Sequence, residues 1–377
     1  MSFDAVAIRV INAFMVSRSM IGDDASADFK TFGQTIISKM ITEMTRQAVA
    51  SWTVGHVRDL EADMRRLVHR IAMKAVLGME DEHELNSLDE LVEGMLSAIP
   101  RAMMFPYDLP GSSYRRMMRT ADGVQAFLQR LVERKTAGAG CQDMLTMLIN
   151  AGQEDGEGFR GAELIAETYN ILCHESSASA LVWMLFLLAQ HPEVYADLLD
   201  ELKGELGGGD PRLEQLSRLP LLERVIKESM RLLPPASFGT RFSTDACSLG
   251  ECELPKGAAV TFSQYITHRL PEIYSEPQRF QPKRWEGFKP ATYEYFPFGV
   301  GVHNCIGGSF AMLEMKLVLC VVLQSYCLKV APNTRVDRVF RLSLRPRRGL
   351  RVLVMPRGSR PSASPVRGNI RHMVDMN

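Results

Sequence analysis

The sequence predicts a mostly α protein with small β-sheets, of the α+β class and built as a single domain. Two observations carry this expectation. Apolar residues recur at three- and four-residue spacing through the first two thirds of the chain, as in Leu60, Met64, Leu67, Ile71 and Val76. Short β-like runs separated by turns follow, within residues 236–268. Helices that precede a small β part in one chain of 377 residues indicate an α+β arrangement around one large core.

The helical periodicity defines a series of segments. They span about residues 32–50, 56–78, 84–100, 112–136, 141–151, 162–189, 192–206 and 219–234. Pro192 opens one of them, and the stretch GGGD ends it. Pro234 and Pro235 stop the last one. Between two of the helices, residues 103–114 contain two prolines and a glycine, which predicts a loop.

The last third of the chain lacks the continuous helical periodicity of the first two thirds. A proline-rich coil at 271–290 leads to a loop that contains Cys305 and then to a helix over about 308–326. Residues 340–356, FRLSLRPRRGLRVLVMP, alternate as a hairpin does. After Pro356 the chain is rich in Arg, Ser and Pro, so we expect a folded domain over 1–356 and a disordered basic tail over 357–377.

Composition excludes several classes of function. The formal net charge is zero, so no overall charge favours nucleic acid. Seven cysteines, an odd number without zinc-finger spacing, are typical of a reducing compartment. The first twenty residues have no signal-peptide pattern, and the longest apolar run, 180–189, is too short to cross a bilayer. We therefore expect a cytoplasmic protein with neither a nucleic-acid partner nor a membrane span.

The stretch FGVGVHNCIG, residues 298–307, places Cys305 just before a helix. Gly301 and Gly307 permit close backbone approach, and the amides at the helix N-terminus favour thiolate over thiol. A nucleophile, a metal or haem ligand and a structural thiol are all open readings of a lone cysteine. The spacing F-x-x-G-x-x-x-C-x-G is specific, because it fixes the residue type at four positions within ten residues.

That motif resembles the cytochrome P450 family of haem-thiolate monooxygenases. The resemblance implies that Cys305 is the axial ligand of the iron in haem b, where thiolate favours O–O cleavage. It also implies that Phe298 packs beside the sulfur and that Gly299 and Gly307 let loop amides temper its charge. Two further residues would contact haem propionates, the loop residue His303 and the strand residue Arg241. A surface histidine and a solvated strand arginine are the alternatives for these two.

A second motif supports the resemblance. In KESMR, Glu228 and Arg231 are three residues apart on one helical face and can pair, as many surface residues do. Family members bury a Glu-Arg-Arg cluster whose third member comes from a P-x-R-F segment. Pro277, Arg279 and Phe280 match that segment, so Arg279 is the predicted third member. Such burial is tolerable only when the charges satisfy one another.

The stretch NILCHESSASALVW, residues 170–183, resembles the central distal helix of the family. The pattern Ala/Gly-Gly-x-Asp/Glu-Thr-Thr/Ser falls on Leu172 to Ser177. Glu175 and Ser176 then supply the acid and the hydroxyl that deliver protons during O₂ cleavage. Cys173, expected against the haem, replaces a glycine, and Leu172 replaces a small residue. Both substitutions add bulk to the oxygen pocket.

Residues expected near the substrate are small or apolar, which predicts a lipophilic substrate; they are Leu172, Cys173, Ser176, Ala236, Ser237 and Phe238. The loop at 105–116 resembles family branches that act on retinoids, sterols or terpenoids. The chain has no flavin or iron–sulfur motif, so electrons would come from a separate ferredoxin or flavodoxin with its reductase. Basic residues such as Lys316, Arg345, Arg347 and Arg348 are candidates to meet an acidic donor, and an ordinary solvated face is the alternative explanation for them.

The main functional hypothesis is a haem-thiolate monooxygenase that hydroxylates or oxidises a hydrophobic terpenoid, steroid or other lipophilic metabolite. Two alternatives stay open. Leu172 and Cys173 favour the same fold with rearrangement, dehydration or peroxide-driven chemistry. A degenerate haem-binding protein without catalysis is compatible with residues 1–30, which diverge from the family and contain no clean copy of its haem-contacting helix. The resemblance is good from about Trp52 to Pro356.

Overall fold

The computed structural model describes residues 25–138, 143, 145–146, 149, 175–301, 304–305, 307–340 and 343–376. The α-helices are α2 (Ala25–Ala50), α3 (Leu60–Leu77), α4 (Glu82–Met104), α5 (Ser113–Ala137), α8 (Glu175–Gln190), α9 (Pro192–Leu206), α10 (Leu213–Leu216), α11 (Pro220–Leu232), α12 (Gln264–Thr267) and α13 (Gly308–Ser325). Two short 3₁₀ helices are η1 (Pro282–Trp285) and η3 (Asn369–His372).

Most predicted helices are found within a few residues of their expected bounds, and the one predicted at 192–206 has the same limits as α9. The segment predicted at 56–78 begins later, at Leu60, because residues 57–59 form strand β1 (Val57–Asp59). The Asp59 carboxylate then caps α3 by accepting the Glu61 amide at 3.1 Å. The helix predicted at 141–151 and the first half of the one at 162–189 lie largely outside the described residues.

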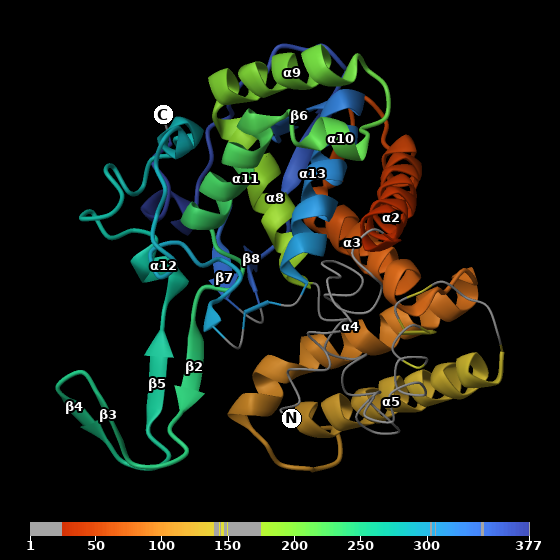
Figure 1. The fold of residues 1–377 in the computed structure, drawn as a ribbon, viewed down its shortest axis with the longest axis vertical. Helices are drawn as coiled ribbons and strands as arrows, with labels where there is room; N and C mark the ends of the chain where they lie inside the picture. Colours follow the sequence, from red (N-terminus) through yellow and green to blue (C-terminus); the bar gives the residue numbers. More distant parts are fainter. Residues whose placement is uncertain are drawn as a thin grey trace.

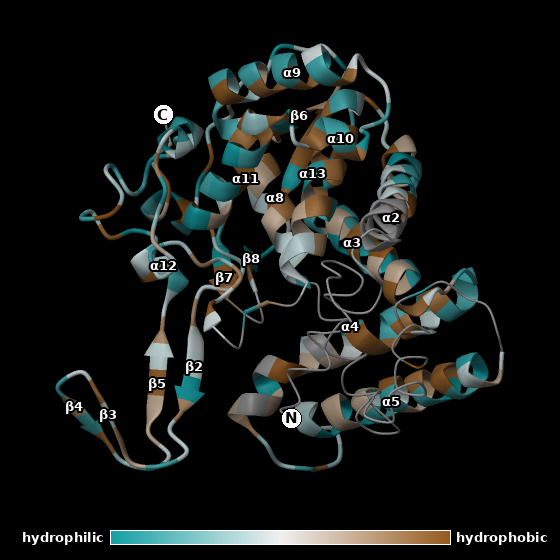
Figure 2. Ribbon diagram, in the orientation of Figure 1, coloured by the Kyte–Doolittle hydropathy of each residue, from teal (hydrophilic) through white to brown (hydrophobic). Residues whose placement is uncertain are grey.

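Helix α8 forms the centre of the molecule (Figure 1) and packs against α3, α9, α11 and α13. All its residues from Ser177 to Gln190 are buried. A helix that is apolar on every side must be covered on every side, and α8 is largely brown in Figure 2, whereas the surface helix α9 alternates in colour. Among the described helices, α13 is apolar and long enough to cross a membrane, yet half of it is buried inside the fold.

The strands of the described residues form four small antiparallel sheets. The largest has the order β1–β9–β6, with β9 (Arg351–Met355) between β1 and β6 (Cys327–Val330). The others are two-stranded: β2 (Gly239–Phe242) with β5 (Ala259–Phe262), β3 (Cys247–Leu249) with β4 (Cys252–Leu254), and β7 (Arg338–Phe340) with β8 (Leu344–Pro346). The hairpin predicted over 340–356 is therefore wrong in its extent: β8 pairs with β7, which begins at Arg338, and β9 pairs with β1 and β6. Strands β2 to β5 extend away from the helices (Figure 1).

The expectation of a disordered tail after Pro356 is wrong for the part that the structure describes. Val366, Ile370, Met373 and Val374 are buried in the main core. The Ser364 hydroxyl donates to the Val330 carbonyl at 2.7 Å, which ties the tail to β6. The Arg-, Ser- and Pro-rich composition of the segment hid these few apolar side chains, and they bury enough surface to order it.

Candidate active site

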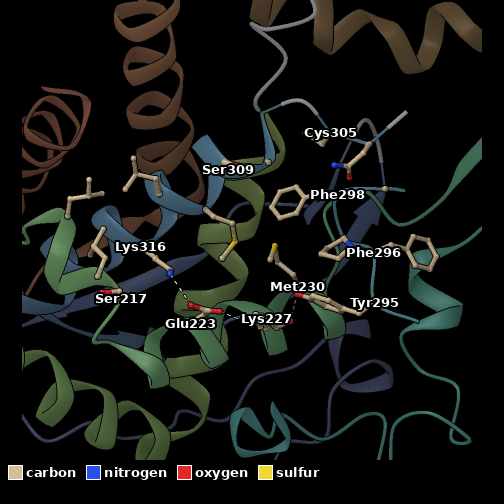
Figure 3. Close-up of a pocket in the computed structure, with 18 residues that line it drawn as sticks. Ser217, Glu223, Lys227, Met230, Tyr295, Phe296, Phe298, Cys305, Ser309 and Lys316 are labelled. Carbon is tan, nitrogen blue, oxygen red and sulfur yellow. Dashed lines mark hydrogen bonds and ion pairs between the residues drawn. The ribbon is translucent and has the colours of Figure 1, made fainter. Parts of the chain in front are cut away.

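A tight loop presents Cys305 at the start of α13 (Figure 3). The Cys305 amide donates to the Phe298 carbonyl at 2.7 Å, and the Gly308 amide donates to the Cys305 carbonyl at 3.2 Å. Gly299 and Gly301 have φ angles of 77° and 70°, which other residues adopt only with strain. These turns explain why the glycines precede the cysteine at set spacing. The Cys305 residue itself is exposed.

The base of this loop is held by two residues outside it. The Phe296 amide donates to His268 Nε2 at 3.0 Å, and the Tyr295 hydroxyl donates to the Lys227 carbonyl at 3.0 Å. Burial lowers the pKa of His268 to about 3, with Arg231 and Arg269 adding to the effect. His268 therefore remains neutral and can accept at Nε2 across the physiological pH range.

The electrostatics at the sulfur differ from the expectation that the helix N-terminus favours thiolate. Desolvation by the surrounding loop raises the pKa of Cys305, and a hydrogen bond from the Gly307 amide lowers it by a smaller amount. The amide is correctly placed, but it does not outweigh the desolvation. A coordinated metal ion would remove the thiol proton.

Cys305, Phe298 and Gly299 line a pocket of about 770 Å³ between the loop, α11 and α13. Phe296, Met230, Met312 and Leu313 supply apolar walls. Three charged side chains lie at the other end, where Glu223 pairs with Lys227 at 2.7 Å and with Lys316 at 3.1 Å (Figure 3). The charge of Lys316 is thus compensated within the fold, which weakens its predicted role in meeting an acidic electron donor.

Glu228 and Arg231 form the buried pair that the KESMR motif predicts, and both side chains have 0% exposure. Arg231 donates through Nε and Nη2 to the two carboxylate oxygens at 2.9 Å. Its Nη1 donates to the carbonyls of His268 and Pro277, each at 2.8 Å. The guanidinium is fully satisfied, since Nη2 also donates to the Arg279 carbonyl at 3.2 Å.

The third member of this cluster is Arg284, and the prediction of Arg279 is wrong. Arg284 Nε lies 3.1 Å from Glu228 Oε1, and its side chain is 7% exposed. Arg279 is 49% exposed and pairs with Glu276 on the surface. The signal is present in the sequence one step later, because PKRW at 282–285 repeats the P-x-R-aromatic pattern of PQRF at 277–280. Trp285 Nε1 also donates to Glu228, at 3.0 Å.

Glu175 and Ser176 lie at the first described turn of α8. Ser176 is exposed, whereas the Glu175 carboxylate accepts Arg345 Nη1 at 2.9 Å. Arg345 is therefore engaged inside the fold and does not offer a free charge to a partner. Leu172, Cys173 and His303 lie outside the described residues, so their predicted roles stay predictions.

The predicted substrate-side segment follows α11. The Ser237 hydroxyl donates to the Pro234 carbonyl at 2.9 Å and is turned toward its own backbone. Ala236 is partly buried, and Phe238 is 48% exposed with its ring 4.6 Å from that of Phe340. Arg241 on β2 is exposed and lies over the Phe262 ring at 5.4 Å. These positions leave Phe238 and Arg241 accessible, and their predicted contacts stay predictions.

A profile of the Cytochrome P450 family matches residues 8–354. The chain belongs to the cytochrome P450 family. Cyclooctat-9-en-7-ol 5-monooxygenase of Streptomyces melanosporofaciens is 29% identical over 306 residues, which are 78% of this chain and 67% of that protein. Cyclooctatin synthase of the same organism is 30% identical over 316 residues, 80% and 69% of the two chains. The chain thus spans about two thirds of the length of these relatives.

Solved P450 structures agree with the fold. Retinoic acid-bound cyanobacterial CYP120A1 superposes with a TM-score of 0.74 at 22% identity and covers 93% of this chain and 83% of that one. The family match confirms the predicted family and, with it, haem b as the cofactor of that family. The likeness to the solved structure confirms the mostly α fold with small sheets.

The donor set of this P450 fits the haem. Cys305 belongs to an exposed loop and offers one sulfur atom, with the Gly307 amide directed at it. The described part of the chain has no group of three or more His, Cys, Asp or Glu side chains able to hold a bare ion. One thiolate suits an iron whose equatorial ligands come with its porphyrin. Two residues that sequence reasoning did not assign to the site are Arg284 and His268, of which only Arg284 carries a motif signal.

Proposed function

We propose that this P450 is a haem-thiolate monooxygenase that hydroxylates a lipophilic small molecule of the terpenoid class. The observation that carries the proposal is the Cys305 loop, which offers one sulfur at the head of α13 with Phe298 beside it. Haem b bound through Cys305 would supply reductive activation of dioxygen. The names of the two Streptomyces relatives, a monooxygenase and a synthase of cyclooctatin, support the choice of a terpenoid-like substrate.

Proton delivery and the support of the Cys305 loop depend on side chains of the protein itself. Monooxygenation consumes protons, and these must reach the oxygen from solvent without leakage. In this proposal Glu175, partly buried at the head of α8, takes protons from solvent. The hydroxyl of Ser176, an exposed residue next in the chain, passes them on. The buried cluster around Glu228 keeps the loop side rigid, because each of its charges has partners.

Electrons would come from a separate ferredoxin or flavodoxin with its reductase, since the sequence has no flavin or iron–sulfur motif of its own. The cytoplasmic location expected from the sequence also stays a proposal. Rearrangement or peroxide-driven chemistry and haem binding without catalysis are the rival functions, and one set of measurements separates them.

The test compares the purified wild-type protein with Cys305→Ala, and Cys247→Ala serves as a control because Cys247 lies exposed on the remote β3 strand. The reduced, carbon monoxide-treated wild type and Cys247→Ala should show the red-shifted Soret band of thiolate ligation, and Cys305→Ala should lose it. Turnover with NADPH and a reductase supports monooxygenation, and turnover with peroxide alone supports the first rival. A wild-type protein that takes up no haem would contradict the proposal.

A further inference from the structure

Strand β8 is fixed along one face of α8. Glu175, Ser179 and Trp183 follow at four-residue spacing and therefore lie on the same side of the helix. Trp183 Nε1 donates to the Leu344 carbonyl at 2.7 Å, and the Ser179 hydroxyl donates to the same oxygen. The next residue of β8 is Arg345, so the backbone clamp delivers its side chain to the start of α8, beside which β8 lies in Figure 1.

Arg345 serves two carboxylates with one nitrogen atom. Nη1 donates to Glu175 Oε1 at 2.9 Å and lies 3.4 Å from Glu61 Oε1 in the first turn of α3. The three side chains are only 13%, 17% and 14% exposed for Arg345, Glu175 and Glu61. Salt screens such a site weakly, so each carboxylate affects the hold of Arg345 on the other.

Glu61 also connects this group to the surface. Arg65 Nη1 lies 4.0 Å from Glu61 Oε1, and Arg65 pairs with Glu93, whose side chain is 50% exposed on α4. Burial raises the pKa of Glu61; Arg345 and Arg65 oppose the rise, and the charges of Asp59 and Glu175 add to it. Glu61 therefore takes up a proton at a higher pH than an ordinary glutamate does.

We propose that Arg345 and Glu61 are positioning residues for Glu175, with Arg345 holding the Glu175 carboxylate in place at the start of α8 and Glu61 setting the strength of that hold. This inference rests on the proposed monooxygenase function and deepens it. When Glu61 is protonated and neutral, Arg345 forms an ion pair with Glu175 alone. With Glu61 ionised, the two carboxylates compete for Arg345. Glu61 exchanges its proton with bulk water, and no other bond changes.

The first experiment measures the coupling without turnover. The Glu61 carboxyl is titrated by NMR in full-length protein carrying ¹³C-labelled glutamate, and Glu61→Gln identifies its signal. Arg345→Gln should raise the pKa of Glu61 by about one unit, because it removes a nearby positive charge. Glu175→Gln should lower that pKa, because it removes a like charge. Arg347→Gln, on an exposed neighbour in the chain, should leave it unchanged.

The second experiment measures turnover by the haem-loaded enzyme with its reductase. Arg345→Gln should lower the yield of product per NADPH about tenfold, with haem content and the carbon monoxide spectrum unchanged, because loss of a positioned proton donor costs at least that much. Arg345→Lys keeps the charge but cannot bridge two carboxylates, so we expect an intermediate yield. Glu61→Gln should flatten the acidic limb of the pH profile of that yield. Arg360→Gln, an exposed position in the C-terminal segment, should match the wild type.

The outcomes test separately the arrangement of Arg345, Glu61 and Glu175, its positioning role, and the proposed monooxygenase function. Unchanged Glu61 titration in both Arg345→Gln and Glu175→Gln would overturn the three-residue arrangement. Coupled titration with a full product yield in Arg345→Gln would overturn the positioning role. A wild type that lacks the thiolate spectrum would end the proposed function, while the Glu61 titration still decides the arrangement. If Arg345→Gln does not fold, Glu175→Gln still provides the titration readout and Arg345→Lys provides the turnover readout.

Discussion

Glu314 is a carboxylic acid sealed inside the protein, and replacing it with glutamine tests whether it is neutral there. The residue lies on α13 with 1% exposure, and neither carboxylate oxygen accepts a hydrogen bond in the described structure. Burial raises its pKa to about 8, and the nearby Ser177 hydroxyl on α8 opposes the rise without reaching hydrogen-bond geometry. At neutral pH the wild-type side chain is therefore mostly protonated.

The size of the effect follows from proton linkage. Glu314 has a pKa of about 8 when folded and about 4.5 when unfolded, so unfolding releases its proton. Its contribution to stability is complete below pH 4.5 and is lost as pH rises through about 8. At about 1.4 kcal/mol per pKa unit, the wild type should lose about 3–4 kcal/mol between pH 5 and pH 8 relative to Glu314→Gln. The fixed cost of burying the amide cancels in this difference.

The assay is urea unfolding, followed by helical circular dichroism, at several values between pH 5 and pH 8. The free energy of unfolding of the wild type should fall relative to that of Glu314→Gln as pH rises, and the difference should level off above pH 8. Glu193→Gln, on the exposed side of α9, should track the wild type throughout. Parallel curves for wild type and Glu314→Gln would refute the reasoning and show that Glu314 meets a partner or solvent.

Two further substitutions test the buried cluster and the distal helix. Arg284→Ala removes one partner of the fully buried Glu228 and should lower the free energy of unfolding by about 3–5 kcal/mol. The matched Arg279→Ala breaks a surface pair and should lower it by about 0–1 kcal/mol in the same urea assay. Equal effects would reject the assignment of Arg284. Ser176→Ala should reduce product per NADPH at least tenfold and increase peroxide release without changing haem content; unchanged product yield would remove Ser176 from proton delivery.

The helical framework was predictable because it depends on local periodicity and on strong boundary signals. Pro192 and the glycines after Leu206 set the limits of α9, and both signals act within one turn of the helix. Strand β1 was missed because its three residues pair with β9 almost three hundred positions later. A segment of that length has no periodicity to read, and a distant partner decides its conformation.

The site was predictable where chemistry demands residue types at fixed spacing. The Cys305 loop needs glycines at positive φ angles, and those requirements are visible in the sequence. Glu314 and Arg345 carry no such signal. A glutamate among apolar residues reads as the polar edge of a helix, and its burial depends on α8 lying across it. Arg345 was predicted to be a surface residue available to an electron donor, because its partners Glu61 and Glu175 come from segments far away in the chain.

The third arginine shows how two correct local signals can compete. Both PQRF and PKRW place an arginine two residues after a proline and before an aromatic ring, so pattern alone accepts either. What separates them is the demand of Glu228, whose two oxygens accept Arg231, Gln281, Arg284 and Trp285 and have 0% exposure. Only one of the two guanidinium groups can reach that carboxylate, and the other must find water. The buried Glu228 carboxylate on α11 selects the arginine that can reach it from the segment around η1. This selection depends on a contact between two segments, so a motif within one segment predicts the cluster but not its third residue.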